Sequence, residues 1–78
     1  MVLQPHVAFG KAVREVREQL RFTQEDLAEI CDLDRTYISG IERGVRNPTI
    51  QTIWVIAAGL NVSPQELIRL TEDYISKL

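Results

Sequence analysis

Basic and hydroxyl side chains gather in one short stretch of the sequence, residues 34–49, which reads DRTYISGIERGVRNPT. It holds three arginines, Arg35, Arg43 and Arg46. A guanidinium group carries a permanent charge and can bind a phosphate or the edge of a guanine through two parallel hydrogen bonds. The stretch therefore predicts a helix that lies against an anion such as the backbone of DNA. The alternative is an ordinary surface helix whose charges are solvated.

The overall charge argues against a nucleic-acid partner but does not exclude one. The chain has 78 residues, with 9 Lys and Arg against 11 Asp and Glu, and a formal net charge of −2. DNA-binding domains are usually basic, but a basic stripe can act locally while acids face elsewhere. Hydrophobic residues make up 45% and charged residues 26%, the balance of one globular domain.

Several classes of site are missing from the sequence. The single cysteine, Cys31, and the single histidine, His6, leave no internal disulfide and no metal site to expect. No paired carboxylates, glycine-rich phosphate loop or Ser/His/Asp set predicts catalysis, so we expect no enzyme activity, cofactor or small-molecule substrate. No signal peptide or membrane span is visible. We expect a cytoplasmic protein.

Capping and turn residues divide the chain into five predicted helices. We expect them at about residues 7–20, 24–31, 35–43, 50–60 and 64–77. Thr23, Asp34, Thr49 and Ser63 precede four of them, where a side-chain oxygen can accept a hydrogen bond from a first-turn N–H group. The sequence thus predicts an all-α fold, a compact five-helix bundle that forms a single domain over residues 1–78.

Only three residues, DLD at 32–34, connect the second and third predicted helices. A connection this short forces a sharp corner, the geometry of a helix-turn-helix. Ala28 is small enough for the two helices to touch, and Leu33 can fill the space beneath the turn. The side chains that we expect to face the core from these helices are Leu27, Ile30, Cys31, Ile38 and Ile41.

These elements together resemble a known family. Residues 23–44, TQEDLAEICDLDRTYISGIERG, are similar to the helix-turn-helix of lambda-repressor-like, or Xre-type, bacterial and phage regulators. Residues 33–49 are more narrowly similar to the controller proteins of restriction–modification systems. The resemblance implies a homodimeric, sequence-specific regulator of transcription that binds a palindromic operator in double-stranded DNA and controls its own operon. The alternatives are another Xre-type repressor or an antitoxin-like module that masks a partner protein, although antitoxins often carry an extra tail.

The residues expected to meet DNA lie in and around the third helix. Ile38 and Ile41 fix its inward face, and the first turn of a recognition helix reaches the base edges. We therefore expect Arg35 and Thr36 to read bases. The residues expected to contact the DNA backbone, or to mix both roles, are Gln24, Tyr37, Ser39, Arg43, Arg46 and Asn47.

The resemblance also implies structural roles. An arginine of the first helix and a glutamate near the end of the third form an ion pair in the family, and Arg17 and Glu42 match those positions. Family members often have glycine where this chain has Arg21 and Asp32, and glycine there serves a positive φ.

The acidic edge of the second helix, which consists of Glu25, Glu29 and Asp32, is either a solvated face or a contact with RNA polymerase or another partner.

The fourth predicted helix is apolar nearly all round, which predicts burial on more than one side. A two-fold dimer through the fourth and fifth helices would provide that burial, and a monomeric core is the alternative. The residues expected at the dimer interface are Ile53, Trp54, Val55, Ile56, Leu67, Leu70 and Tyr74.

Overall fold

The computed structural model describes residues 3–76, which form five α-helices and no strand. The helices are α1 (Pro5–Gln19), α2 (Gln24–Cys31), α3 (Arg35–Glu42), α4 (Ile50–Gly59) and α5 (Pro64–Ser76). The prediction of an all-α helix-turn-helix fold is confirmed. Helix α1 begins two residues earlier than expected because the ring of Pro5 fixes a φ angle that suits a first turn. The expected end of the last helix at Lys77 lies outside the described residues.

Side chains cap four of the helices at their amino-terminal ends. Thr23 and Asp26 form a reciprocal pair, in which each side chain accepts a hydrogen bond from the other's backbone N–H group, at 3.0 and 2.8 Å. Asp34, Thr49 and Ser63 cap α3, α4 and α5, and each side chain accepts a hydrogen bond from one first-turn N–H group without a return bond to the cap's own N–H group. These bonds satisfy N–H groups that have no partner within the helix, so each helix begins at a defined residue.

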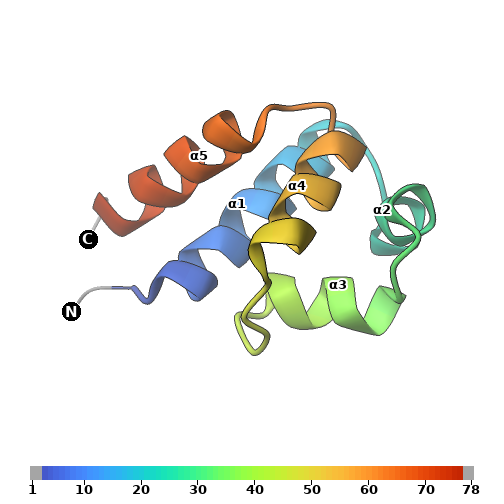
Figure 1. Ribbon diagram of the computed structural model, residues 1–78, viewed down its shortest axis with the longest axis horizontal. Helices are drawn as coiled ribbons and strands as arrows, with labels where there is room; N and C mark the ends of the chain where they lie inside the picture. The colour runs from blue at the N-terminus through green and yellow to red at the C-terminus, as the bar shows by residue number, and fades with distance from the viewer. Residues whose placement is uncertain (1–2, 77–78) are drawn as a thin grey trace.

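Helix α1 runs through the centre of the molecule and packs against α5 along one side and α3 on another (Figure 1). Helices α2 and α3 form the sharp corner, and α4 closes the core between α2 and α5. The largest fully buried side chains are Val13, Leu27, Ile38, Ile41, Ile56, Leu60 and Leu67. Ile30 was expected in this core, but 52% of it is exposed on the outer side of α2.

Helices α1 and α3 meet closely at Gly10. A Cβ atom placed there would lie 2.0 Å from the carbonyl oxygen of Ile41 and 3.1 Å from the Cα of Glu42. Only a residue without a side chain allows the two backbones to approach this closely. The fixed distance between α1 and α3 matters for the site, because Glu42 at the end of α3 faces α1.

Three described turns use a left-handed backbone at residues other than glycine; they follow α1, α2 and α4, and the last is at Asn61. Arg21 follows α1 with a φ of 61°, and Asp32 follows α2 with a φ of 54°. These are the two positions at which family members often have glycine. Aspartate tolerates this conformation with little strain, whereas arginine does so less readily.

We predict that Arg21→Gly raises the free energy of unfolding by about 0.5–1 kcal/mol, since relief of the strain exceeds the added chain entropy of glycine. Urea denaturation followed by circular dichroism measures the change. Asp32→Gly is the matched control and should give a smaller gain. A loss of stability in Arg21→Gly would show that this turn is not strained.

Candidate nucleic-acid interface

Two buried residues determine which side of α3 faces outward. Ile38 and Ile41 are fully buried, so the residues between and around them turn to the opposite side of the helix. Arg35, Thr36 and Arg43 are exposed, and Tyr37 and Ser39 are half-buried. Arg35, Thr36, Ser39 and Arg43 therefore share one face, whereas Tyr37 lies at its edge and packs in part against the core.

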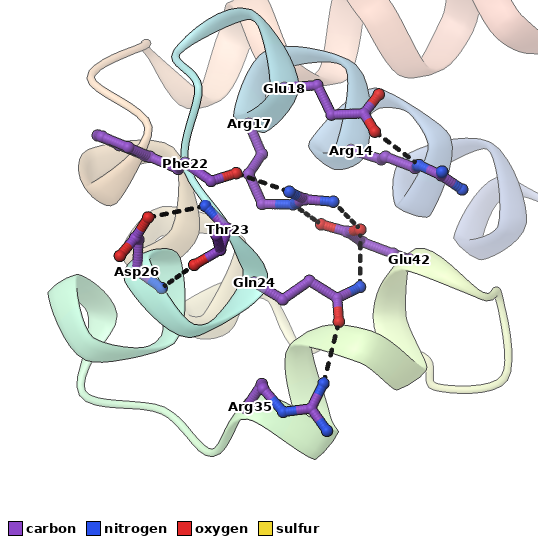
Figure 2. A network of polar contacts seen from close by, with 9 residues as sticks. All are labelled: Arg14, Arg17, Glu18, Phe22, Thr23, Gln24, Asp26, Arg35 and Glu42. Carbon is purple, nitrogen blue, oxygen red and sulfur yellow. Dashed lines mark hydrogen bonds and ion pairs between the residues drawn. The ribbon is translucent and has the colours of Figure 1, made fainter.

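A buried ion pair fixes the end of α3. The Nε of Arg17 donates to Glu42 at 2.7 Å and a terminal nitrogen donates to its second oxygen at 2.9 Å (Figure 2). The other terminal nitrogen of Arg17 donates to the carbonyl oxygen of Phe22 at 2.7 Å. The two charged side chains are only 10% and 3% exposed. The bonds to Glu42 raise the pKa of Arg17, and they turn the one acid of α3 inward, away from the candidate interface.

Gln24 connects this ion pair to the candidate base-reading arginine. Its amide nitrogen donates to Glu42 at 3.1 Å, and its amide oxygen accepts a bond from Arg35 at 3.4 Å (Figure 2). A carboxylate can only accept hydrogen bonds, so Glu42 decides which end of the amide faces it. The oxygen is left for Arg35. The sequence suggested a phosphate contact for Gln24, and nothing in the local pattern indicated this link.

Thr36 is tied to the cap of its own helix. Its hydroxyl donates to the carboxylate of Asp34 at 2.7 Å, and its backbone N–H donates to the same oxygen at 2.9 Å. Both bonds lower the pKa of Asp34, and the bond from the hydroxyl contributes more than the bond from the backbone N–H. With its hydroxyl engaged, Thr36 has its methyl group available for an apolar contact.

The loop after α3 adds two more exposed polar residues, Arg46 and Asn47. The guanidinium carbon of Arg46 lies 5.9 Å from the centre of the Tyr37 ring, within the range of a cation–π contact. The loop arginine therefore lies beside α3 and extends its basic surface. No described group of His, Cys, Asp and Glu side chains could hold a metal ion.

The candidate dimer face differs from the set expected from sequence. Ile56 and Leu67 are fully buried within the chain, so the expectation that they contact a partner is wrong. Ile53, Val55 and Leu70 are half-buried against the same core. Tyr74 is half-buried, and its hydroxyl donates to Glu15 of α1, which raises the pKa of Tyr74. The large apolar side chains exposed on α4 and α5 are Ile50, Trp54 and Ile68.

No helix in the described part of the chain is both long and apolar enough to cross a membrane.

A family model described as helix-turn-helix matches residues 13–67. Control protein C.BamHI of Bacillus amyloliquefaciens is 47% identical over 64 residues, which cover 81% of this chain and 79% of that protein. Control protein C.SmaI of Serratia marcescens is 45% identical over 56 residues, which cover 72% of this chain and 67% of that protein.

Solved structures of restriction–modification controller proteins have the same arrangement of helices. C.AhdI from Aeromonas hydrophila matches with a TM-score of 0.77 at 42% identity, covering 80% of this chain and 94% of that chain. The C.Esp1396I tetramer in complex with its natural 35 base-pair operator matches with a TM-score of 0.87 at 38% identity. That match covers 95% of this chain and 97% of the controller chain.

Proposed function

The chain belongs to the helix-turn-helix family and, within it, to the control proteins of restriction–modification systems, and from this premise we propose that it regulates the operon of such a system, including its own gene. It is a DNA-binding regulator of transcription, and its family is not a family of enzymes. We propose that it acts without catalysis, as a homodimer on a palindromic operator.

One observation carries the DNA-binding role. Glu42, the only acid within α3, is bonded inward to Arg17, and the arginines of the helix and its following loop remain exposed. The chain is acidic overall, but the face that α3 offers is basic. Such a face attracts phosphates and releases their counterions, which supplies most of the sequence-independent affinity.

We assign base reading to Arg35 and Thr36, in the first turn of α3. The guanidinium of Arg35 can bond O6 and N7 of a guanine, and the Thr36 methyl can contact the methyl group of thymine. Gln24, Tyr37, Ser39, Arg43, Arg46 and Asn47 then contact the DNA backbone or combine both roles. Gln24 can donate to a phosphate only through the second N–H of its amide, because the amide nitrogen already donates to Glu42 and the amide oxygen can only accept.

We predict that Arg35→Ala relaxes preference at one base pair, with a loss of about 1–3 kcal/mol on the preferred sequence alone. Selection of bound duplexes from a random pool, followed by titrations of the single-base variants, measures this. Arg43→Ala is the matched control: it should weaken binding to all sequences and reduce the slope of log K against log salt by about one. Equal losses for Arg35→Ala on selected and random DNA would contradict base reading, and no selection at all would favour a protein-masking role.

The proposed dimer uses the apolar side chains left exposed on α4 and α5. Trp54 is 57% exposed, with Ile50 on the same helix and Ile68 on α5. Trp54 and Ile68 line one groove between α4 and α5, and an exposed apolar patch on a small domain marks a contact surface. Two recognition helices held about 34 Å apart would read a palindrome with half-sites one helical turn apart, and their affinities would combine.

We predict that Trp54→Glu raises the dimer dissociation constant by roughly 30-fold or more, because it places a charge at an aromatic anchor. Sedimentation equilibrium at micromolar concentration measures the change. Ile30→Glu is the matched control, since Ile30 is similarly exposed but lies on α2, and it should leave the oligomeric state unchanged. A monomer in the unaltered protein, with and without DNA, would contradict the interface.

A further inference from the structure

Gly40, in the middle of α3, lies directly against the side chain of Arg46. A Cβ atom placed at Gly40 would lie 2.7 Å from the Cγ of Arg46 and 3.6 Å from its Nε. The remaining close neighbour is a methyl group of Val45, also at 3.6 Å. Outside the helix itself, the space of the missing side chain is therefore taken by the stem of Arg46. Among the described residues, no backbone atom from outside α3 lies closer to this position than these side-chain atoms.

Two further contacts keep Arg46 on this course. The backbone N–H groups of Val45 and Arg46 both donate to the carbonyl oxygen of Gly40, at 3.0 and 3.2 Å. Tyr37 lies three residues before Gly40, and its ring faces the guanidinium of Arg46. The side chain of Arg46 thus starts in the loop, crosses Gly40 and ends over Tyr37.

We propose that Gly40 and Tyr37 are positioning residues that seat the guanidinium of Arg46 on the outward face of α3. We call Gly40 and Tyr37 together the seat of Arg46. Because of these two contacts, an arginine of the loop becomes part of the recognition surface. A long side chain that is already ordered loses less rotamer freedom when it binds its ligand. Gly40 therefore contributes to DNA affinity although it has no side chain of its own. The role in affinity rests on the proposed function.

The test is Gly40→Ala, with binding measured on a duplex selected from a random pool. The melting temperature should stay the same or rise, because alanine favours a helix and only the movable Arg46 stem must shift. Affinity should fall roughly two- to tenfold, the change expected when one long side chain must be ordered on binding. A lower melting temperature would show that the glycine serves helix packing, and unchanged affinity would show that Arg46 needs no seat. Either result overturns the proposal.

Double variants provide the matched control. Arg46→Ala should weaken binding less in a Gly40→Ala background than in the unaltered protein, because the two changes remove the same contribution. Arg35→Ala should cost the same in both backgrounds. Full additivity of Gly40→Ala with Arg46→Ala would overturn the proposal.

An NMR measurement on the protein without DNA tests the contact of Arg46 with Gly40 and Tyr37 independently of the proposed DNA-binding function. The ring of Tyr37 should shift the NMR signals of the Arg46 side-chain protons upfield. The shift should persist in Tyr37→Phe and disappear in Tyr37→Leu and Gly40→Ala. No shift in the unaltered protein overturns the seat even if DNA binds. A clear shift in a protein that binds no DNA overturns the proposed function, and with it the role of the seat in affinity.

Discussion

Gly10→Ala is expected to lower the free energy of unfolding by about 3 kcal/mol, a large effect for the addition of one methyl group. The new Cβ would meet the carbonyl oxygen of Ile41 at 2.0 Å and the carbonyl carbon at 3.0 Å. Both are backbone atoms of α3 and cannot rotate aside, so the two helices must separate. Separation would open the core around Ile41 and pull Glu42 away from Arg17. Urea denaturation monitored by circular dichroism measures the loss.

Gly40→Ala is the matched control for this prediction. Its added Cβ also lies too close to a neighbour, but that neighbour is a side-chain atom of an exposed residue and can move. The two substitutions add the same methyl group to a helical glycine, but only Gly10→Ala should lower stability, whereas Gly40→Ala should leave it unchanged or raise it. A Gly10→Ala protein within 1 kcal/mol of the unaltered one would show that α1 and α3 do not meet this closely.

Glu42→Gln is expected to lower the free energy of unfolding by about 3–5 kcal/mol. The substitution keeps the shape of the side chain but leaves the charge of Arg17 without its partner in a site where the arginine is 10% exposed. It also frees the amide of Gln24 to reverse, because a glutamine at position 42 can both donate and accept. The midpoint of urea denaturation measures the first effect.

Glu18→Gln is the matched control, since it removes the same charge from an ion pair on the surface. Glu18 bonds Arg14 at 3.2 Å, with both side chains more than half exposed, and exposed pairs contribute about 0–1 kcal/mol. The double variant Arg17→Met with Glu42→Leu should recover part of the stability, because no buried charge then lacks a partner. If Glu42→Gln melts at the temperature of the unaltered protein, the ion pair has no structural role.

The starts of four of the five helices could be predicted because each of these begins with a local signal. Thr23, Asp34, Thr49 and Ser63 act through hydrogen bonds to residues two or three positions away, so the sequence alone contains the whole interaction. The inward face of α3 was equally accessible, since Ile38 and Ile41 are three residues apart and share one side of a helix. Arg35 and Thr36 then had to lie on the outer side.

Contacts between distant residues could not be predicted in the same way. Gly10 appeared from sequence to be only a modest cost to a helix, and its contact with Ile41 links positions 31 residues apart. The link from Glu42 through Gln24 to Arg35 joins the two ends of α3 across α2 and leaves no periodic pattern. The Arg17–Glu42 pair was expected only because the family resemblance pointed to it.

The proposed dimer face shows a further limit of prediction from sequence. A helix that is apolar on all sides has no polar stripe to separate the core from a contact surface. Helix α4 is such a helix, so Ile56 was assigned to the dimer interface although it lies in the core, while exposed Ile50 was not assigned. Only the packing of α5 and α2 against α4 decides which side remains open.

The inward ion pair of Glu42 has a consequence for how such a regulator could be given a new target. The groups that hold α3 in place are Ile38, Ile41 and Glu42, and none of them belongs to its outward face. Substitutions at Arg35 and Thr36, the proposed base readers, are therefore expected to alter operator preference while the fold keeps its anchors. A recognition surface transplanted from a relative should include Tyr37, Gly40 and Arg46 together, because these three positions form one unit.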